Sequence, residues 1–170
     1  MKVPPKKFAP LVAGALRMGA ATAKVIPAST VVTGEWVRMK CRHGCGGYGT
    51  SLRCPPYSPE PSATARMLGE YRWAILFEAG RGEPMEIAAS LEREAFLAGW
   101  YKAFGMGAGP CDLCDECAFD EGCRYPEKSR PAMEACGIDV YATVNRQGFD
   151  LEVVKTHRDK PRFFGLVLVE

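Results

Sequence analysis

The alternation of apolar and polar residues along the chain predicts a mixture of helices and strands. Apolar positions recur at helical spacing from Glu83-Pro84 to about Phe104, and a first-turn proline is typical of a helix start. Short apolar runs at Arg72–Glu78 and Phe163–Val169 predict buried strands. The positions of the long helix expected to face the core are Ile87, Ala88, Leu91, Ala95, Ala98 and Tyr101.

The rest of the pattern predicts shorter elements. Pro10–Ala23 favours an alanine-rich helix packed on the core, and Glu35–Lys40 favours a strand. Asp139 is suited to cap a helix that Gly148 ends. Further elements are expected as helices at Pro61–Glu70, Glu127–Ala135 and Asp139–Gln147, and as a strand at Asp150–Lys155 joined by a polar turn to the last strand. We therefore expect an α+β or α/β fold, with a small sheet, packed helices and cysteine-rich loops between the elements.

Length and composition suit one globular domain. The 170 residues, 47% hydrophobic and 25% charged, can form one core, so we expect a single domain over residues 1–170 in which 1–9 are a candidate disordered segment. The net charge of +2 gives no reason to expect nucleic-acid binding. No apolar run approaches the roughly 20 residues of a membrane helix, so no membrane association is expected either.

The N-terminal segment imitates a secretory signal. A basic start precedes the apolar run Phe8–Leu16, and the small residues Ala21-Thr22-Ala23 follow it. Arg17 interrupts the run, which favours a core helix over an export signal. We therefore do not expect this segment to direct export.

Eight cysteines carry the strongest chemical signal. Three of them form a C-x2-C-x2-C run from Cys111 to Cys117, which packs thiols more closely than a disulfide framework needs. This spacing is typical of loops that hold an iron–sulphur cluster, and eight is the number that two four-thiolate clusters require. The candidate ligands are Cys41, Cys45, Cys54, Cys111, Cys114, Cys117, Cys123 and Cys136.

Two cysteines complete these sets in either of two ways. In two-cluster ferredoxins the cysteine after the triplet ligates the other cluster, and by analogy Cys123 would complete the first group and Cys136 the second. The opposite pairing is nearly as well supported, because five residues separate Cys117 from Cys123. Alternatively Cys136 is a buried free thiol, which would leave one site with three cysteines and an open iron.

Zinc is the lesser alternative. Four thiolates hold structural zinc well, but zinc ribbons use two separated C-x2-C pairs and not an unbroken triplet. The two histidines do not change this picture. His43 lies within the first cysteine group without the second histidine that a Rieske centre needs, and His157 lies in a polar turn.

Charge is distributed unevenly around the two cysteine groups. Opposite signs would help to bring the groups together, whereas a solvated acidic rim could instead bind a basic redox partner. The basic residues beside the first group are Arg38, Lys40, Arg42 and Arg53, and the acidic residues around the second are Asp112, Asp115, Glu116, Asp120 and Glu121.

Three segments resemble an uncharacterised prokaryotic family of predicted metal-binding proteins, a domain of unknown function. They are MKCRHGCGGYGTSLRCPPYSP (Met39–Pro59), GMGAGPCDLCDEC (Gly105–Cys117) and CRYPEKSRPAMEACGIDV (Cys123–Val140). The resemblance implies metal or iron–sulphur binding in a cytoplasmic, oxygen-poor setting, and it brings no established reaction.

Three functions are compatible with these observations. The first is electron transfer through two [4Fe–4S] clusters to or from a redox protein partner. The second is an iron–sulphur enzyme whose open iron binds substrate, for example in sulphur transfer or reduction. The third is a binding module stabilised by zinc. The sequence does not decide whether the protein is an enzyme, and it leaves the oligomeric state open.

Overall fold

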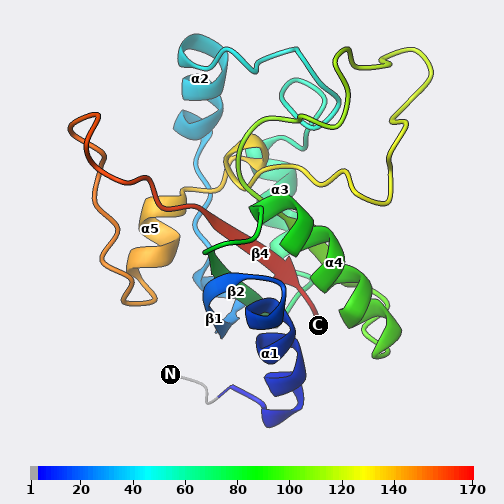
Figure 1. Cartoon of the computed structure of the whole chain (residues 1–170), viewed down its shortest axis with the longest axis vertical. Helices are drawn as coiled ribbons and strands as arrows, with labels where there is room; N and C mark the ends of the chain where they lie inside the picture. The colour runs from blue at the N-terminus through cyan, green and yellow to red at the C-terminus, as the bar shows by residue number, and fades with distance from the viewer. Residues whose placement is uncertain (1–3) are drawn as a thin grey trace.

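The strand predicted at Arg72–Glu78 lies in the middle of a four-stranded antiparallel sheet. In the computed structural model, which describes residues 4–170, this strand is β2 (Trp73–Ala79). It pairs with β1 (Ala20–Pro27) on one side and with β4 (Phe164–Leu168) on the other. Strand β3 (Phe104–Met106) pairs with β4, so the order is β1-β2-β4-β3 (Figure 1).

Helices cover both faces of this sheet, which explains why Trp73–Phe77 of β2 are an unbroken apolar run. Ile75 and its neighbours two residues away face α1 (Ala9–Arg17) and α4 (Pro84–Leu97). Leu76 faces the opposite layer, which contains α3 (Pro61–Leu68), the 3-10 helix η3 (Glu134–Cys136) and α5 (Val140–Asn145). A central strand that is covered on both faces exposes no position to water, so it needs no polar alternation. The fold is α+β, as predicted.

Two helices differ in extent from their predictions because a glycine ends each of them early. The helix predicted over Pro10–Ala23 ends at Arg17, where Gly19 adopts a φ of 99°, and the chain continues as β1. The helix predicted up to about Phe104 ends at Leu97, before Gly99 with a φ of 98°. Four of its six predicted core positions are buried, whereas Ala98 and Tyr101 lie beyond the helix and are exposed.

Three further predictions are corrected by the structure. Glu35–Lys40 is not a strand but the first part of α2 (Glu35–Gly44), whose buried residues Val37 and Arg38 share one helical face. Only the end of the predicted helix Glu127–Ala135 is helical, as η3. Asp150–Lys155 is an irregular segment, exposed except for the partly buried Leu151, and Asp150 has a positive φ of 51°.

The predicted helices at Pro61–Glu70 and Asp139–Gln147 are present as α3 and α5. Asp139 caps α5, since its carboxylate accepts a hydrogen bond of 2.9 Å from the N–H of Ala142.

The N-terminal segment is attached to the core. Lys6–Phe8 form a 3-10 helix, η1, and the fully buried Phe8 ring lies 5.0 Å from Trp100, measured between centroids. The first part of the candidate disordered segment 1–9, residues 1–3, lies outside the described residues. A short 3-10 helix, η2 (Ala28–Thr30), follows β1. Among the described residues, no helix combines the length and the apolar character needed to cross a membrane.

Close packing of the residue after β3 against α4 predicts a stability effect at Gly107. A Cβ atom at this position would lie 2.9 Å from the backbone Cα of Met85, which can move only with its helix. We expect Gly107→Ala to lower the free energy of unfolding by about 1–3 kcal/mol, measured by urea denaturation. Gly46→Ala is the control, because no atom lies within 4 Å of its added Cβ. Equal effects of the two substitutions would contradict the packing argument.

Candidate metal centre

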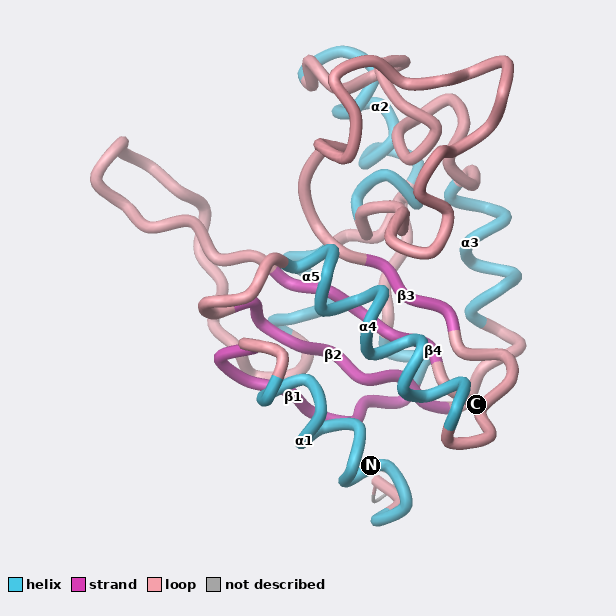
Figure 2. The backbone as a smooth tube through the Cα atoms, turned by 45° about the vertical axis from the view of Figure 1, so that its right-hand side comes forward, coloured by secondary structure: helices cyan, strands magenta, loops and turns pink. Residues whose placement is uncertain are grey.

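The two cysteine-rich loops lie against each other at one end of the molecule. The first loop follows α2 and runs to α3, and the second connects β3 to η3 (Figures 1 and 2). The N–H of Leu52 in the first loop donates a hydrogen bond of 3.4 Å to Cys117 Sγ in the second. The rings of Tyr57 and Phe119 also meet across the loops, with centroids 5.0 Å apart. Segments that are distant in the sequence thus form one cysteine-rich region.

The second loop is closed at its base by backbone hydrogen bonds. The N–H of Gly107 donates to the carbonyl of Pro131 at 3.0 Å, and the N–H of Met133 donates to the carbonyl of Gly107 at 2.9 Å. These bonds form a short parallel bridge between Gly107 and Ala132. The residues between them, which include four cysteines, therefore form a loop whose ends are fixed.

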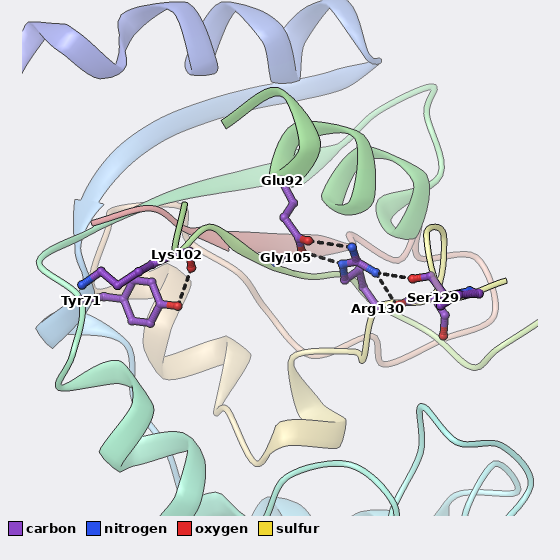
Figure 3. A network of polar contacts seen from close by, with 7 residues as sticks. Tyr71, Glu92, Lys102, Gly105, Ser129 and Arg130 are labelled. Carbon is purple, nitrogen blue, oxygen red and sulfur yellow. Dashed lines mark hydrogen bonds and ion pairs between the residues drawn. The ribbon is translucent and has the colours of Figure 1, made fainter. Parts of the chain in front are cut away.

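Glu92 on α4 strengthens this closure (Figure 3). Its carboxylate forms a two-bond ion pair with Arg130, with Nε–Oε2 at 2.5 Å and Nη2–Oε1 at 2.6 Å. The same Oε2 accepts the N–H of Gly105 at 2.6 Å. Arg130 also donates to the carbonyl of Ser129 at 2.7 Å. One carboxylate therefore fixes both ends of the second loop to the helix.

The other contact in Figure 3 holds the segment before β3. The Tyr71 hydroxyl donates to the carbonyl of Lys102 at 2.6 Å, and the Lys102 ammonium donates to the carbonyl of Glu70 at 3.0 Å. The chain therefore enters β3, and then the second loop, from a fixed start.

Four cysteines of the second loop line a single cavity of about 250 Å³. All four are partly exposed, and the cavity wall includes Ser51 and Arg53 from the first loop. Cys123 thus lies with the triplet and not with the first group, which favours Cys123 as the residue that completes the second group. Over residues 4–170, no three histidine, cysteine or acidic side chains converge closely enough to be identified as a preformed metal site. The four cysteines of this cavity are Cys111, Cys114, Cys117 and Cys123.

The first cysteine group gathers at the end of α2. Cys45 Sγ and Cys54 Sγ lie 3.6 Å and 3.7 Å from the point where a Cβ on Gly47 would stand. Cys41, on the last turns of α2, has its Sγ 3.9 Å from the carbonyl oxygen of Glu134. Burial, and next the nearby Cys45, raise the pKa of the Cys41 thiol. Three thiols therefore form the first group.

Buried Arg38 fixes the first loop to the neighbouring elements. Its guanidinium donates to Ser58 Oγ at 3.1 Å, to the Ser58 carbonyl at 3.2 Å and to the Pro59 carbonyl. Ser58 Oγ in turn donates to the carbonyl of Ala135 in η3 at 2.6 Å. The far end of the loop that carries Cys54 is thereby attached to both α2 and η3.

Cys136 has a different environment from the other seven cysteines. It is fully buried in an apolar cluster with Met133 and Ile138, on the sheet face opposite α4. Burial raises the pKa of its thiol to about 12. These surroundings are those of a core thiol. His43 and His157 are both exposed.

The region is suited to an anionic metal cluster. The Arg53 side chain is only 5% exposed, and its Nη1 donates to Cys111 Sγ at 3.5 Å. Its Nε and Nη2, together with Ser51 Oγ, are buried without a hydrogen-bond partner among the described residues. A buried guanidinium requires negative charge nearby, which several thiolates around a metal cluster supply.

The expectation about opposite charges is only partly reflected in the contacts. In the described part of the chain, Arg38 beside the first cysteine group pairs with Glu60, and Glu121 beside the second group pairs with Arg124. Neither ion pair links the basic residues of the first group to the acidic residues of the second. The loops meet instead through Leu52, Arg53 and the Tyr57–Phe119 ring pair. The five acidic residues predicted around the second cysteine group are all exposed: Asp112, Asp115, Glu116, Asp120 and Glu121.

The Glu92–Arg130 pair was not anticipated from the sequence. The two residues are 38 positions apart, and each resembles an ordinary surface charge in its local context. A single sequence contains no local signal that could have joined them.

Comparison with known proteins identifies a family. A family model described as predicted metal-binding protein (DUF2284) matches residues 24–84 and 78–169. No curated protein matches the chain. The search of solved structures also finds no match.

Proposed function

Because the chain belongs to the DUF2284 family of predicted metal-binding proteins, we propose that it binds an iron–sulphur cluster in the cavity between its two cysteine loops. The supporting observation is that four thiols line this one cavity, since a [4Fe–4S] cluster is held by four cysteine thiolates. When bound, the cluster supplies one-electron redox chemistry. The ligands we propose are Cys111, Cys114, Cys117 and Cys123.

A second cluster at the first cysteine group completes the proposal. Cys41, Cys45 and Cys54 supply its thiolates, and the apolar surroundings of Cys136 argue against a ligand role for that residue. Two clusters side by side in a small protein are suited to passing single electrons. We therefore propose electron transfer in an oxygen-poor cytoplasm, which keeps thiols reduced.

The exposed acidic residues of the second loop indicate the kind of redox partner. Five carboxylates surround the proposed cluster, and only Glu121 among them forms an ion pair within the described residues. A partner with a basic surface would be attracted to this rim, and its association would weaken with increasing salt.

One observation favours a second candidate function at the first site. This group has three cysteines, and Cys45 is exposed to solvent. A cluster held by three thiolates has one iron free to bind another ligand. The first site would then bind a substrate, for example in sulphur transfer or reduction, while the second site supplies electrons.

Anaerobic purification with chemical analysis tests the proposal. We expect about eight irons and eight acid-labile sulphides per chain, together with a broad absorbance band that dithionite bleaches. Zinc bound without sulphide would contradict the proposal and favour the zinc-stabilised module. Iron without sulphide would also contradict it. Free thiols are counted in the same sample, so that a low metal content caused by disulfide formation is recognised.

A further inference from the structure

One short segment of the first loop contacts both cysteine groups. The N–H of Leu52 donates to Cys117 Sγ at 3.4 Å, and Arg53 Nη1 donates to Cys111 Sγ at 3.5 Å. The next residue, Cys54, belongs to the first group, with its Sγ near that of Cys45 beside Gly47. Three consecutive residues therefore supply a thiol to one group and two hydrogen bonds to the other.

Arg53 is the cation best placed to interact with the second group. It is buried, it lines the cavity of the four thiols, and two of its nitrogens lack a partner among the described residues. The ion pairs of the described residues do not include Arg53. Within the described residues its side-chain hydrogen bond is therefore to sulphur and not to a carboxylate, and burial from water strengthens this interaction.

We propose that Arg53, supplied by the first cysteine loop, sets the reduction potential of the cluster held by the second loop. This inference rests on the proposed function. Reduction adds one electron, and hence one negative charge, to the cluster. A guanidinium in contact with a ligand sulphur stabilises the reduced form more than the oxidised form, so it raises the potential. The Leu52 N–H, which donates to Cys117 Sγ, also raises the reduction potential.

The test compares Arg53→Met with Arg42→Met under anaerobic conditions. Arg42 is exposed on α2 beside Cys41, so its substitution changes the net charge equally without removing a contact to the second loop. Potentiometric titration followed by EPR measures the midpoint potential of the cluster. We expect Arg53→Met to lower the equilibrium constant for reduction of the cluster at least about tenfold. For a one-electron couple this corresponds to a midpoint potential about 59 mV lower. Arg42→Met is expected to change it much less, because exposed charges are screened.

Two further outcomes have defined meanings. Equal shifts in both variants, or no shift in Arg53→Met, would overturn the proposal. If Arg53→Met does not fold, as judged by circular dichroism, Arg53→Gln replaces it, since glutamine keeps a donor and loses the charge. An unchanged potential in Arg53→Gln would then overturn the role of Arg53. Absence of an EPR-active cluster in the unsubstituted protein would instead refute the proposed function.

Discussion

Arg130→Met is expected to lower the free energy of unfolding by about 3 kcal/mol. The substitution leaves the Glu92 carboxylate, which is 16% exposed, without its guanidinium partner. Breaking a buried ion pair by removing one partner typically costs about 3–5 kcal/mol, and the partial exposure places this pair at the lower end. The substitution also removes the hydrogen bond that Arg130 donates to the carbonyl of Ser129. Urea denaturation of the metal-free protein measures the effect.

The matched control for this experiment is Arg93→Met. Arg93 follows Glu92 on α4 and is exposed, so the same change of side chain there is expected to cost less than about 0.5 kcal/mol. A loss below about 1 kcal/mol in Arg130→Met would show that the ion pair does not stabilise the closed loop.

A double variant separates the ion pair from the second role of Glu92. Glu92→Leu combined with Arg130→Met removes both charges, but it also removes the acceptor for the N–H of Gly105. We expect the double variant to be more stable than the sum of the two single changes predicts, because no unpaired charge remains. It still remains less stable than the unsubstituted protein, since a buried N–H has lost its partner.

The sequence was sufficient to predict the elements whose signal is local. The apolar run of β2, the helix that starts at Pro84 and the Asp139 cap each depend on a few adjacent residues, and all three are present. The cysteine spacing likewise indicated that the second loop holds a group of thiols.

The predictions that failed depended on partners distant in the sequence. Ala20–Pro27 has weak strand propensity and becomes β1 because it pairs with the edge of β2, with Val25 opposite Ile75. Phe104–Met106 is a strand for the same reason, since it pairs with β4. The short Glu35–Lys40 segment is compatible with either periodicity, and the burial of Val37 and Arg38 on one face selects the helix.

Which cysteine lies beside the triplet could not be derived from spacing, because it depends on where the loop ends are fixed. Bonds from Gly107 to Pro131 and Met133 close the second loop around Cys123, whereas Cys136 lies beyond this closure in η3. Cys123, inside the closure, lines the cavity with the triplet, and Cys136, outside it, lies in the core.

Cys123→Ala is expected to alter one cluster and to leave the other unchanged. Cys123 lies on the cavity wall with the other three thiols of the second loop, so its loss leaves the proposed site with three ligands. We expect the loss of about one to four irons per chain in protein purified anaerobically, with one EPR signal changed or lost and the other retained. If Cys123 instead completed the first group, Cys123→Ala would affect the same signal that Cys45→Ala affects. Comparing the EPR spectra of these two variants therefore distinguishes the two arrangements.

Cys136→Ala is the contrasting substitution, because the same change of atoms is made in the apolar core. Its sulphur is fully buried beside Met133 and Ile138, so removing it leaves a small cavity and costs about 1–2 kcal/mol of stability. All iron and sulphide should be retained. Loss of metal in Cys136→Ala, with stability changed by less than this amount, would make Cys136 a ligand and close the first site with four thiolates. Retention of metal leaves that site with three cysteines, and it is this result that would direct attention to small molecules able to bind the remaining iron.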